Sequence, residues 1–142
     1  MSTKGFSLLE VMVVVVIVGI IAAIAIPSYN GYMTRTRRAE AVQTLETVAL
    51  YQEKHLAERG VYGTLAQLVA NVGLSNPNAD PDRNYAIAVV LGAGSTSYVA
   101  TATGMNRQLG DVAFALDSNG NRGVPGGGGV TPNAELWRTL RD

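Results

Sequence analysis

The sequence of 142 residues contains no cysteine and a single histidine, His55. Without cysteine the chain has no disulfide, no thiolate zinc site and no cysteine nucleophile, and one histidine leaves little material for a catalytic triad or a multi-histidine metal site. Eleven basic residues balance eleven acidic ones, so the basic surface expected of a dedicated nucleic-acid-binding protein is missing. These absences favour a structural or binding protein over an enzyme.

Sequence motifs of catalysis and metal binding are also missing. Acidic and amide residues alternate from Asp80 to Asn84 as in a calcium loop, but Tyr85 stands at the glycine position and Leu91 at the position of the bidentate glutamate. A second such run, which begins at Asp117, fails in the same way. We therefore interpret both runs as turns, and we expect no catalytic residue, no metal site and no cofactor.

A long apolar run dominates the N-terminal region. Val11 to Ile26 are all apolar or small, and Glu10 is the one acid in the apolar stretch that precedes them. Together with this preceding stretch, the run is long enough to cross a bilayer once. A cleaved secretory signal is one interpretation, since Ala23-Ile24-Ala25 fits a signal peptidase site. A signal anchor and a membrane segment that later packs against copies of itself are the others, and the retained acid argues against a disposable signal.

The N-terminal residues read Lys4-Gly5-Phe6-Ser7-Leu8-Leu9-Glu10, and the apolar run ends in Ile26-Pro27-Ser28-Tyr29. This arrangement resembles the type IV pilins, whose precursors carry a short basic leader ending in glycine, then phenylalanine, with glutamate at the fifth mature position. A weaker similarity, to the PilE-type minor pilins, continues to the end of the chain. The resemblance implies that a prepilin peptidase cleaves between Gly5 and Phe6 and methylates the new amine of Phe6.

The same resemblance implies a subunit of a type IV pilus. Its partners would be copies of itself or other pilins, the prepilin peptidase, the inner-membrane assembly machinery and, before assembly, lipid. Counting basic residues on the two sides of the apolar run would place the C-terminal part in the cytoplasm, whereas the resemblance places it in the periplasm and later in the extracellular pilus, and we follow the resemblance. Adhesion, twitching motility and DNA uptake are the expected roles. A filament-displayed module that binds DNA or a surface receptor, and a type II secretion pseudopilin, remain alternatives, although the charge balance does not favour DNA.

Glu10 is the residue most directly tied to assembly. On a helix it lies about one turn from Phe6, so its carboxylate can pair with the terminal amine of its own or a neighbouring chain. Burying either charge alone is costly, and pairing offsets that cost; the alternative is a carboxylate that reaches the headgroups. Gly19 and Pro27 weaken the helix, and the stretch between them either melts on assembly, as the resemblance implies, or contains a simple proline kink.

The expected fold is α+β, with a long N-terminal helix and an antiparallel sheet of three to four strands packed on its C-terminal half. An apolar stripe through Leu45 and Leu56 extends one helix from Phe6 to about Arg59. We expect a cleaved leader (1–5), a transmembrane and assembly half (6–26), an amphipathic half (27–59) and a globular head (60–142). In the head we expect Thr64 to cap a short helix through Val69, followed by strands at 85–91, 98–103 and 112–116, a turn at Asn119-Gly120 and, from the resemblance, a fourth strand.

The C-terminal region departs from the resemblance. Many pilins close this region with a disulfide and carry cysteine before a late tryptophan, whereas here Leu136 precedes Trp137. Without a disulfide, we expect Val124 to Pro132, which includes four consecutive glycines, to be mobile unless Leu136, Trp137 and Leu140 dock into the head. The expected anchor of this region is the docking of Leu136 and Trp137 into the head.

Overall fold

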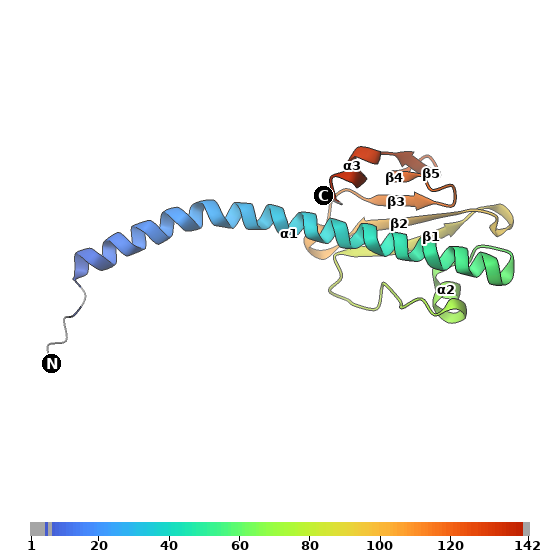
Figure 1. The fold of residues 1–142 in the computed structure, drawn as a ribbon, viewed down its shortest axis with the longest axis horizontal. Helices are drawn as coiled ribbons and strands as arrows, with labels where there is room; N and C mark the ends of the chain where they lie inside the picture. Colours follow the sequence, from blue (N-terminus) through green and yellow to red (C-terminus); the bar gives the residue numbers. More distant parts are fainter. Residues whose placement is uncertain (1–4, 6, 141–142) are drawn as a thin grey trace. The chain divides into compact units, whose positions relative to one another are not determined.

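A computed structural model describes residues 5 and 7–140. The predicted methylation site Phe6 and leader residues 1–4 lie outside the described residues, whereas Gly5 is exposed. The chain divides into two compact units, Met1–Arg35 and Thr36–Asp142, which we call the stem unit and the head unit. Helix α1, Leu8–Arg59, contributes to both units (Figure 1).

Helix α1 confirms the predicted single long helix. It passes through Gly19 and Pro27 without interruption and ends at Arg59. Gly60 follows in the left-handed region, at φ 75°, and its N–H donates to the carbonyl of Leu56 at 2.8 Å. Glycine tolerates this conformation without a Cβ clash, so it ends the helix where the sequence indicated.

The head half of α1 buries one side. Its buried residues recur at near-helical spacing, at Ala41, Val42, Leu45, Val48, Gln52 and His55. The apolar members of this stripe share one core with residues of the sheet, including Ile87, Ala100, Phe114 and Leu116. The sheet therefore packs on this stripe of α1.

The sheet has five antiparallel strands in chain order, arranged as a meander (Figure 1). The strands are β1 (Tyr85–Leu91), β2 (Tyr98–Gly104), β3 (Phe114–Asp117), β4 (Arg122–Gly126) and β5 (Gly129–Pro132). Each connection is short, which is compatible with antiparallel neighbours. The predicted turn at Asn119-Gly120 lies between β3 and β4, and Gly120 has a φ of 78°.

The sheet has five strands and not the three to four expected, and β4 and β5 contain most of Val124 to Pro132. Strands β4 and β5 form a hairpin in which Val124 pairs with Thr131 and Gly126 with Gly129. The two turn residues, Gly127 and Gly128, have φ values of 53° and 85°. A two-residue hairpin turn of this kind needs positive φ at both positions, so glycine here specifies a turn and does not mark a flexible linker.

Two short helices complete the head. Helix α2, Leu65–Val72, extends three residues beyond the predicted end at Val69, and it begins with a capping box in which Thr64 and Gln67 satisfy each other's backbone N–H. Helix α3, Ala134–Arg138, is capped by the side chain of Asn133. The 3-10 turns η1 (Ala93–Ser95) and η2 (Asn106–Gln108) follow β1 and β2.

Candidate functional site

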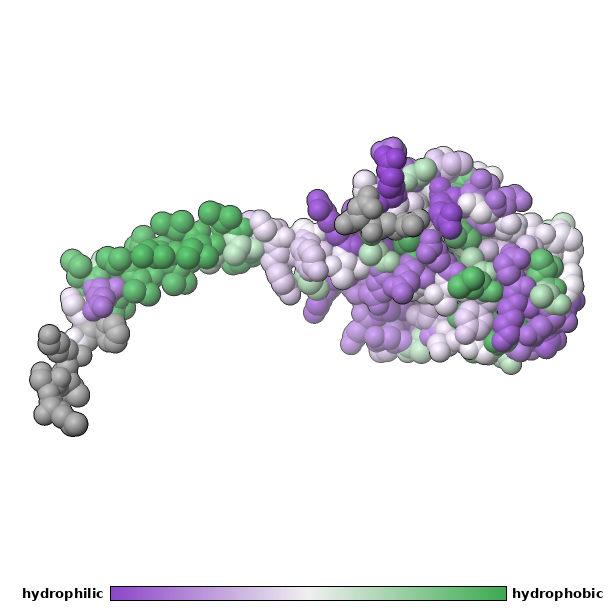
Figure 2. Space-filling model, in the orientation of Figure 1, coloured by the Kyte–Doolittle hydropathy of each residue, from purple (hydrophilic) through white to green (hydrophobic). Residues whose placement is uncertain are grey.

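The stem unit presents an apolar surface. The large apolar side chains from Leu8 to Ile26 are between 50% and 78% exposed, and they dominate this part of the helix (Figure 2). This part of α1 is long and apolar enough to cross a membrane. A helix that is apolar all round must be covered by lipid or by other protein chains.

Glu10 lies on α1 near its N-terminal end and is exposed. Because Phe6 lies outside the described residues, the structure does not place the amine with which Glu10 is predicted to pair. Gly19 and Pro27 are both helical here. The pairing of Glu10 and the melting of this stretch in a filament therefore stay predictions.

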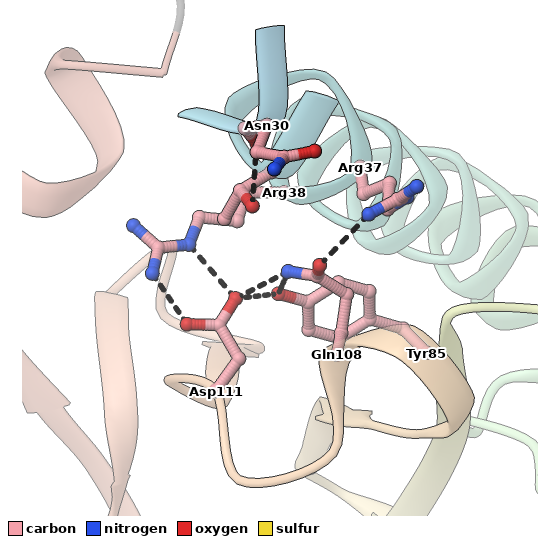
Figure 3. Close-up of polar contacts among 7 residues, drawn as sticks. Asn30, Arg37, Arg38, Tyr85, Gln108 and Asp111 are labelled. Carbon is pink, nitrogen blue, oxygen red and sulfur yellow. Dashed lines mark hydrogen bonds and ion pairs between the residues drawn. The ribbon is translucent and has the colours of Figure 1, made fainter. Parts of the chain in front are cut away.

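A polar network in the head unit ties the loop after β2 to α1 (Figure 3). The carboxylate of Asp111 accepts two hydrogen bonds from Arg38, one of them from Nε at 2.8 Å. It also accepts from the hydroxyl of Tyr85 at 2.7 Å and from Nε2 of Gln108 at 2.6 Å. Nη1 of Arg37 donates to Oε1 of Gln108 at 3.4 Å. Both oxygens of one carboxylate thus join residues from α1, β1 and the η2 loop.

The electrostatics of this network indicate a structural clamp. Hydrogen bonds from Arg38, reinforced by the hydroxyl of Tyr85, hold the pKa of Asp111 well below its ordinary value. Burial, with the hydrogen bond to Asp111 next, raises the pKa of Tyr85 to about 12. Near neutral pH, Asp111 is therefore ionised and Tyr85 is neutral. The sequence did not single out this pair, because Arg38 and Asp111 are separated by 73 positions and no local pattern links them.

A second buried polar group fixes the turn after α1. The side-chain amide of Gln52 donates to the carbonyl of Gly63 at 2.7 Å and accepts from its N–H at 2.9 Å. The ring of buried His55 lies 2.8 Å from the carbonyl of Val61 through Nδ1. The one histidine therefore takes part in a structural contact.

The predicted C-terminal anchor residues lie at the core. Trp137 is 3% exposed, its indole N–H donates to the carbonyl of Gly123 at 3.1 Å, and its ring meets that of Phe114 edge-on at 6.3 Å. Leu136 is half-buried against the same core. Burial, a hydrogen bond and contact with the core are what an anchor requires. The contribution of these residues to the stability of the head stays a prediction.

The two loops with calcium-like spacing form turns. Oδ1 of Asp80 accepts from the N–H of Asp82 at 2.8 Å, and Oδ1 of Asp117 accepts from the N–H groups of Asn119 and Asn121 at 2.9 Å. Such contacts are typical of Asx turns. Over residues 5 and 7–140 no group of three or more acidic or histidine side chains could hold a metal ion.

Exposed arginines gather near the C-terminal end of the head. Arg122 and Arg138 line an open depression together with Asn121 and Trp137. Arg122 lies over the ring of Trp137 at 5.9 Å and is 3.6 Å from the carboxylate of Glu46, whereas Arg138 is 2.7 Å from that of Glu135. Both arginine side chains are more than 40% exposed, so these ion pairs are weak.

Comparison with known families accounts for most of the chain. Residues 1–26 match the prokaryotic N-terminal methylation motif, and residues 27–112 match the family described as "Type IV minor pilin ComP, DNA uptake sequence receptor". The first match contains the predicted leader and the apolar run. The second contains the head half of α1, helix α2, strands β1 and β2, and the loop that carries Asp111.

Individual pilins are also similar to the chain. It is 31% identical to the fimbrial protein EcpC of Eikenella corrodens, over 84% of this chain and 77% of that protein. It is 30% identical to a type IV major pilin protein PilE1 of Neisseria gonorrhoeae, over 75% of this chain and 57% of that protein; the chain thus spans little more than half of the gonococcal pilin. A solved type IV pilin from Shewanella oneidensis is 26% identical and covers 62% of this chain and 88% of its own, with a TM-score of 0.47.

These matches confirm several expectations together. The chain is a structural subunit and not an enzyme, its partners are the filament and the prepilin peptidase, and it resides in the inner membrane before it enters a pilus. The apolar run is the N-terminal hydrophobic helix of such a subunit. With the methylation motif at its start and a pilin family match through most of the rest, the chain belongs to the type IV pilin family.

Proposed function

We propose that this chain is a minor pilin whose head receives DNA at the surface of a type IV pilus. The match of residues 27–112 to a family described as a DNA uptake sequence receptor is the observation that carries the proposal. That match covers much of the head, the part of a pilin that a filament displays. Among the roles expected from the sequence, DNA uptake is therefore favoured over adhesion and motility.

Polymerisation through the stem is the first step of this function. The exposed apolar side chains from Leu8 to Ile26 exchange lipid for the stems of neighbouring subunits. Glu10 pairs with the methylated amine of Phe6 after cleavage at Gly5, so a subunit in the wrong register leaves a charge unpaired. The stretch from Gly19 to Pro27 is the place where the stem would lengthen if it melts.

The distribution of charge supports particular contact residues for DNA. Residues 60–142 carry five arginines against six acids, so the net charge of the head offers no attraction. Of these arginines, Arg107, Arg122 and Arg138 are exposed. Asp111, in contrast, is occupied by Arg38, and Asp117 by its own turn. Since phosphates respond to local charge, the exposed arginines are the candidate contacts.

DNA binding by the full chain in detergent tests this role. We expect binding to double-stranded DNA that weakens steeply with salt. We expect Arg122→Gln with Arg138→Gln to lower the slope of log affinity against log salt by about 1 for each phosphate that the variant no longer neutralises. Arg59→Gln, at the exposed end of α1, is the matched control. Absence of binding to the unaltered chain would contradict the DNA role, and an unchanged slope in the double variant would reject these two contacts.

Mass spectrometry of sheared surface filaments tests the minor character. We expect peptides of this chain at low abundance relative to the main subunit, with a mature N-terminus at methylated Phe6. If the chain were instead the most abundant subunit, its role would be that named for the gonococcal relative, a major pilin.

A further inference from the structure

Two tyrosines follow the apolar run of the stem. Tyr29 and Tyr32 are 63% and 66% exposed. They are three residues apart on α1, so they lie on neighbouring positions of one side of the helix. The first charged residue after them is Arg35, and no charged residue lies between Glu10 and Arg35.

The spacing between Glu10 and the tyrosines matches the thickness of a bilayer. At 1.5 Å per residue, Tyr29 lies roughly 29 Å and Tyr32 roughly 33 Å from Glu10 along the helix. The hydrocarbon core of a typical bilayer is about 30 Å thick. When the carboxylate of Glu10 lies at the inner boundary of the core, the two phenol rings therefore lie at the outer boundary.

The apolar run alone is too short to fill this thickness. Val11 to Ile26 spans roughly 24 Å, so with Glu10 at the inner boundary the residues after Ile26 enter the outer boundary region. Two hydroxyls in this part of the helix already have partners. The hydroxyl of Ser28 donates to the carbonyl of Ile24 at 3.1 Å, and the hydroxyl of Thr34 donates to the carbonyl of Asn30 at 3.1 Å. Hydroxyls that are satisfied within the helix cost less to remove from water.

We propose that Tyr29 and Tyr32 form the outer interfacial anchor of the membrane-held subunit and set the depth at which it stands before assembly. Tyrosine suits this position because its ring is apolar and its hydroxyl hydrogen-bonds to headgroups and water. The partner is the boundary between lipid headgroups and hydrocarbon. This role precedes polymerisation and is independent of the proposed DNA contacts.

The absence of cysteine makes a depth measurement straightforward. Asn30→Cys places a reporter thiol between the two tyrosines in the full chain, reconstituted in vesicles of phosphatidylethanolamine and phosphatidylglycerol. A membrane-impermeant maleimide then reports exposure of position 30 to water. We expect Tyr29→Leu with Tyr32→Leu to slow the labelling by about tenfold, because the lengthened apolar segment draws the helix inward. Tyr29→Trp with Tyr32→Trp should keep the rate within about twofold, because tryptophan is also an interfacial residue.

A reporter in the head separates depth from orientation and folding. Ala66→Cys lies on exposed helix α2, and its labelling gives the fraction of chains with the head outside the vesicle. Rates at position 30 are normalised to it in all three backgrounds. Equal normalised rates in the tyrosine and leucine backgrounds would overturn the proposal. The proposal would also be overturned if the normalised labelling rate at position 30 fell as much in the tryptophan background as in the leucine background. Loss of pili without a change in labelling would assign the tyrosines to filament packing and also count against an anchor.

Discussion

The two parts of α1 use apolar residues in opposite ways. From Leu8 to Ile26 the large apolar side chains are at least half exposed, whereas Leu45 and Val48 in the head unit are fully buried. The stem part is apolar on every side, and the head part is apolar along one stripe with polar residues elsewhere. One continuous helix therefore contains a surface that needs a partner and a surface that already has one.

This difference indicates where the stem unit and the head unit obtain their stability. The head buries its stripe under a sheet of its own chain, so its core exists in the single subunit. The apolar side chains from Leu8 to Ile26 have no such cover within the described residues, and the hydrophobic effect drives them first into lipid and then among other stems. Substitutions in the head should change folding, and substitutions in the stem should change assembly.

The largest effect is expected in the stem. Glu10→Ala should abolish or cripple incorporation into filaments, because the terminal amine loses its charged partner. Membrane insertion and leader cleavage should remain, since both precede assembly. Immunoblots of sheared filaments and of membranes measure the two fractions separately. Normal incorporation would mean that the carboxylate merely reaches the headgroups.

Truncation of the head before Glu135 should produce the largest loss of stability. It removes Trp137, whose loss alone is expected to cost about 3–5 kcal/mol, as for other buried large aromatics. Thermal melting of the full and the truncated chain in the same detergent measures the effect. An unchanged melting temperature would remove the anchor role of the C-terminal segment.

A pair of leucines on α1 gives a matched test of burial. Leu45→Ala should lower the free energy of unfolding by about 2–5 kcal/mol, because Leu45 is 0% exposed. Leu50→Ala, at a position that is 71% exposed, should change it by less than about 0.5 kcal/mol. Urea unfolding in detergent measures both variants. Similar losses in the two variants would contradict the packing of the sheet on the Leu45 side of the helix.

Removal of the structural clamp at Asp111 should give a smaller loss of stability, and this loss should depend on pH. Asp111→Asn should cost about 1–3 kcal/mol at pH 7, because Arg38 loses its charged acceptor. The folded pKa of Asp111 is depressed, so its contribution is complete above the unfolded value of about 4 and disappears as the pH falls through the folded value. Urea unfolding at pH 7 and pH 3 should show the difference between the two chains shrinking. Asp82→Asn, in an exposed loop, is the control, and a difference that does not shrink would argue against the ionised clamp.

Local patterns allowed much of the fold to be predicted. The end of α1 at Arg59, the cap at Thr64 and the first strand at 85–91 follow from glycine, hydroxyl and alternating apolar residues. A fourth strand was expected from the resemblance, but its hairpin with β5 was missed because consecutive glycines fit both a linker and a tight turn. Its strands pair with their neighbours in the sheet, and a short glycine-rich segment does not encode that pairing.

The sequence by itself determined the membrane stem, the single long helix and the family, because these depend on the composition and order of contiguous residues. Only the tertiary structure decided that Asp111 joins Arg38 to Tyr85, that Gln52 holds Gly63 and that Trp137 donates to Gly123. Each of these contacts joins residues that are at least 11 positions apart and lie on different elements or loops, and the packing of the sheet and loops on α1 brings them together. Chain order specifies neighbours along a helix or strand, whereas the clamp arises from the way in which those elements are stacked.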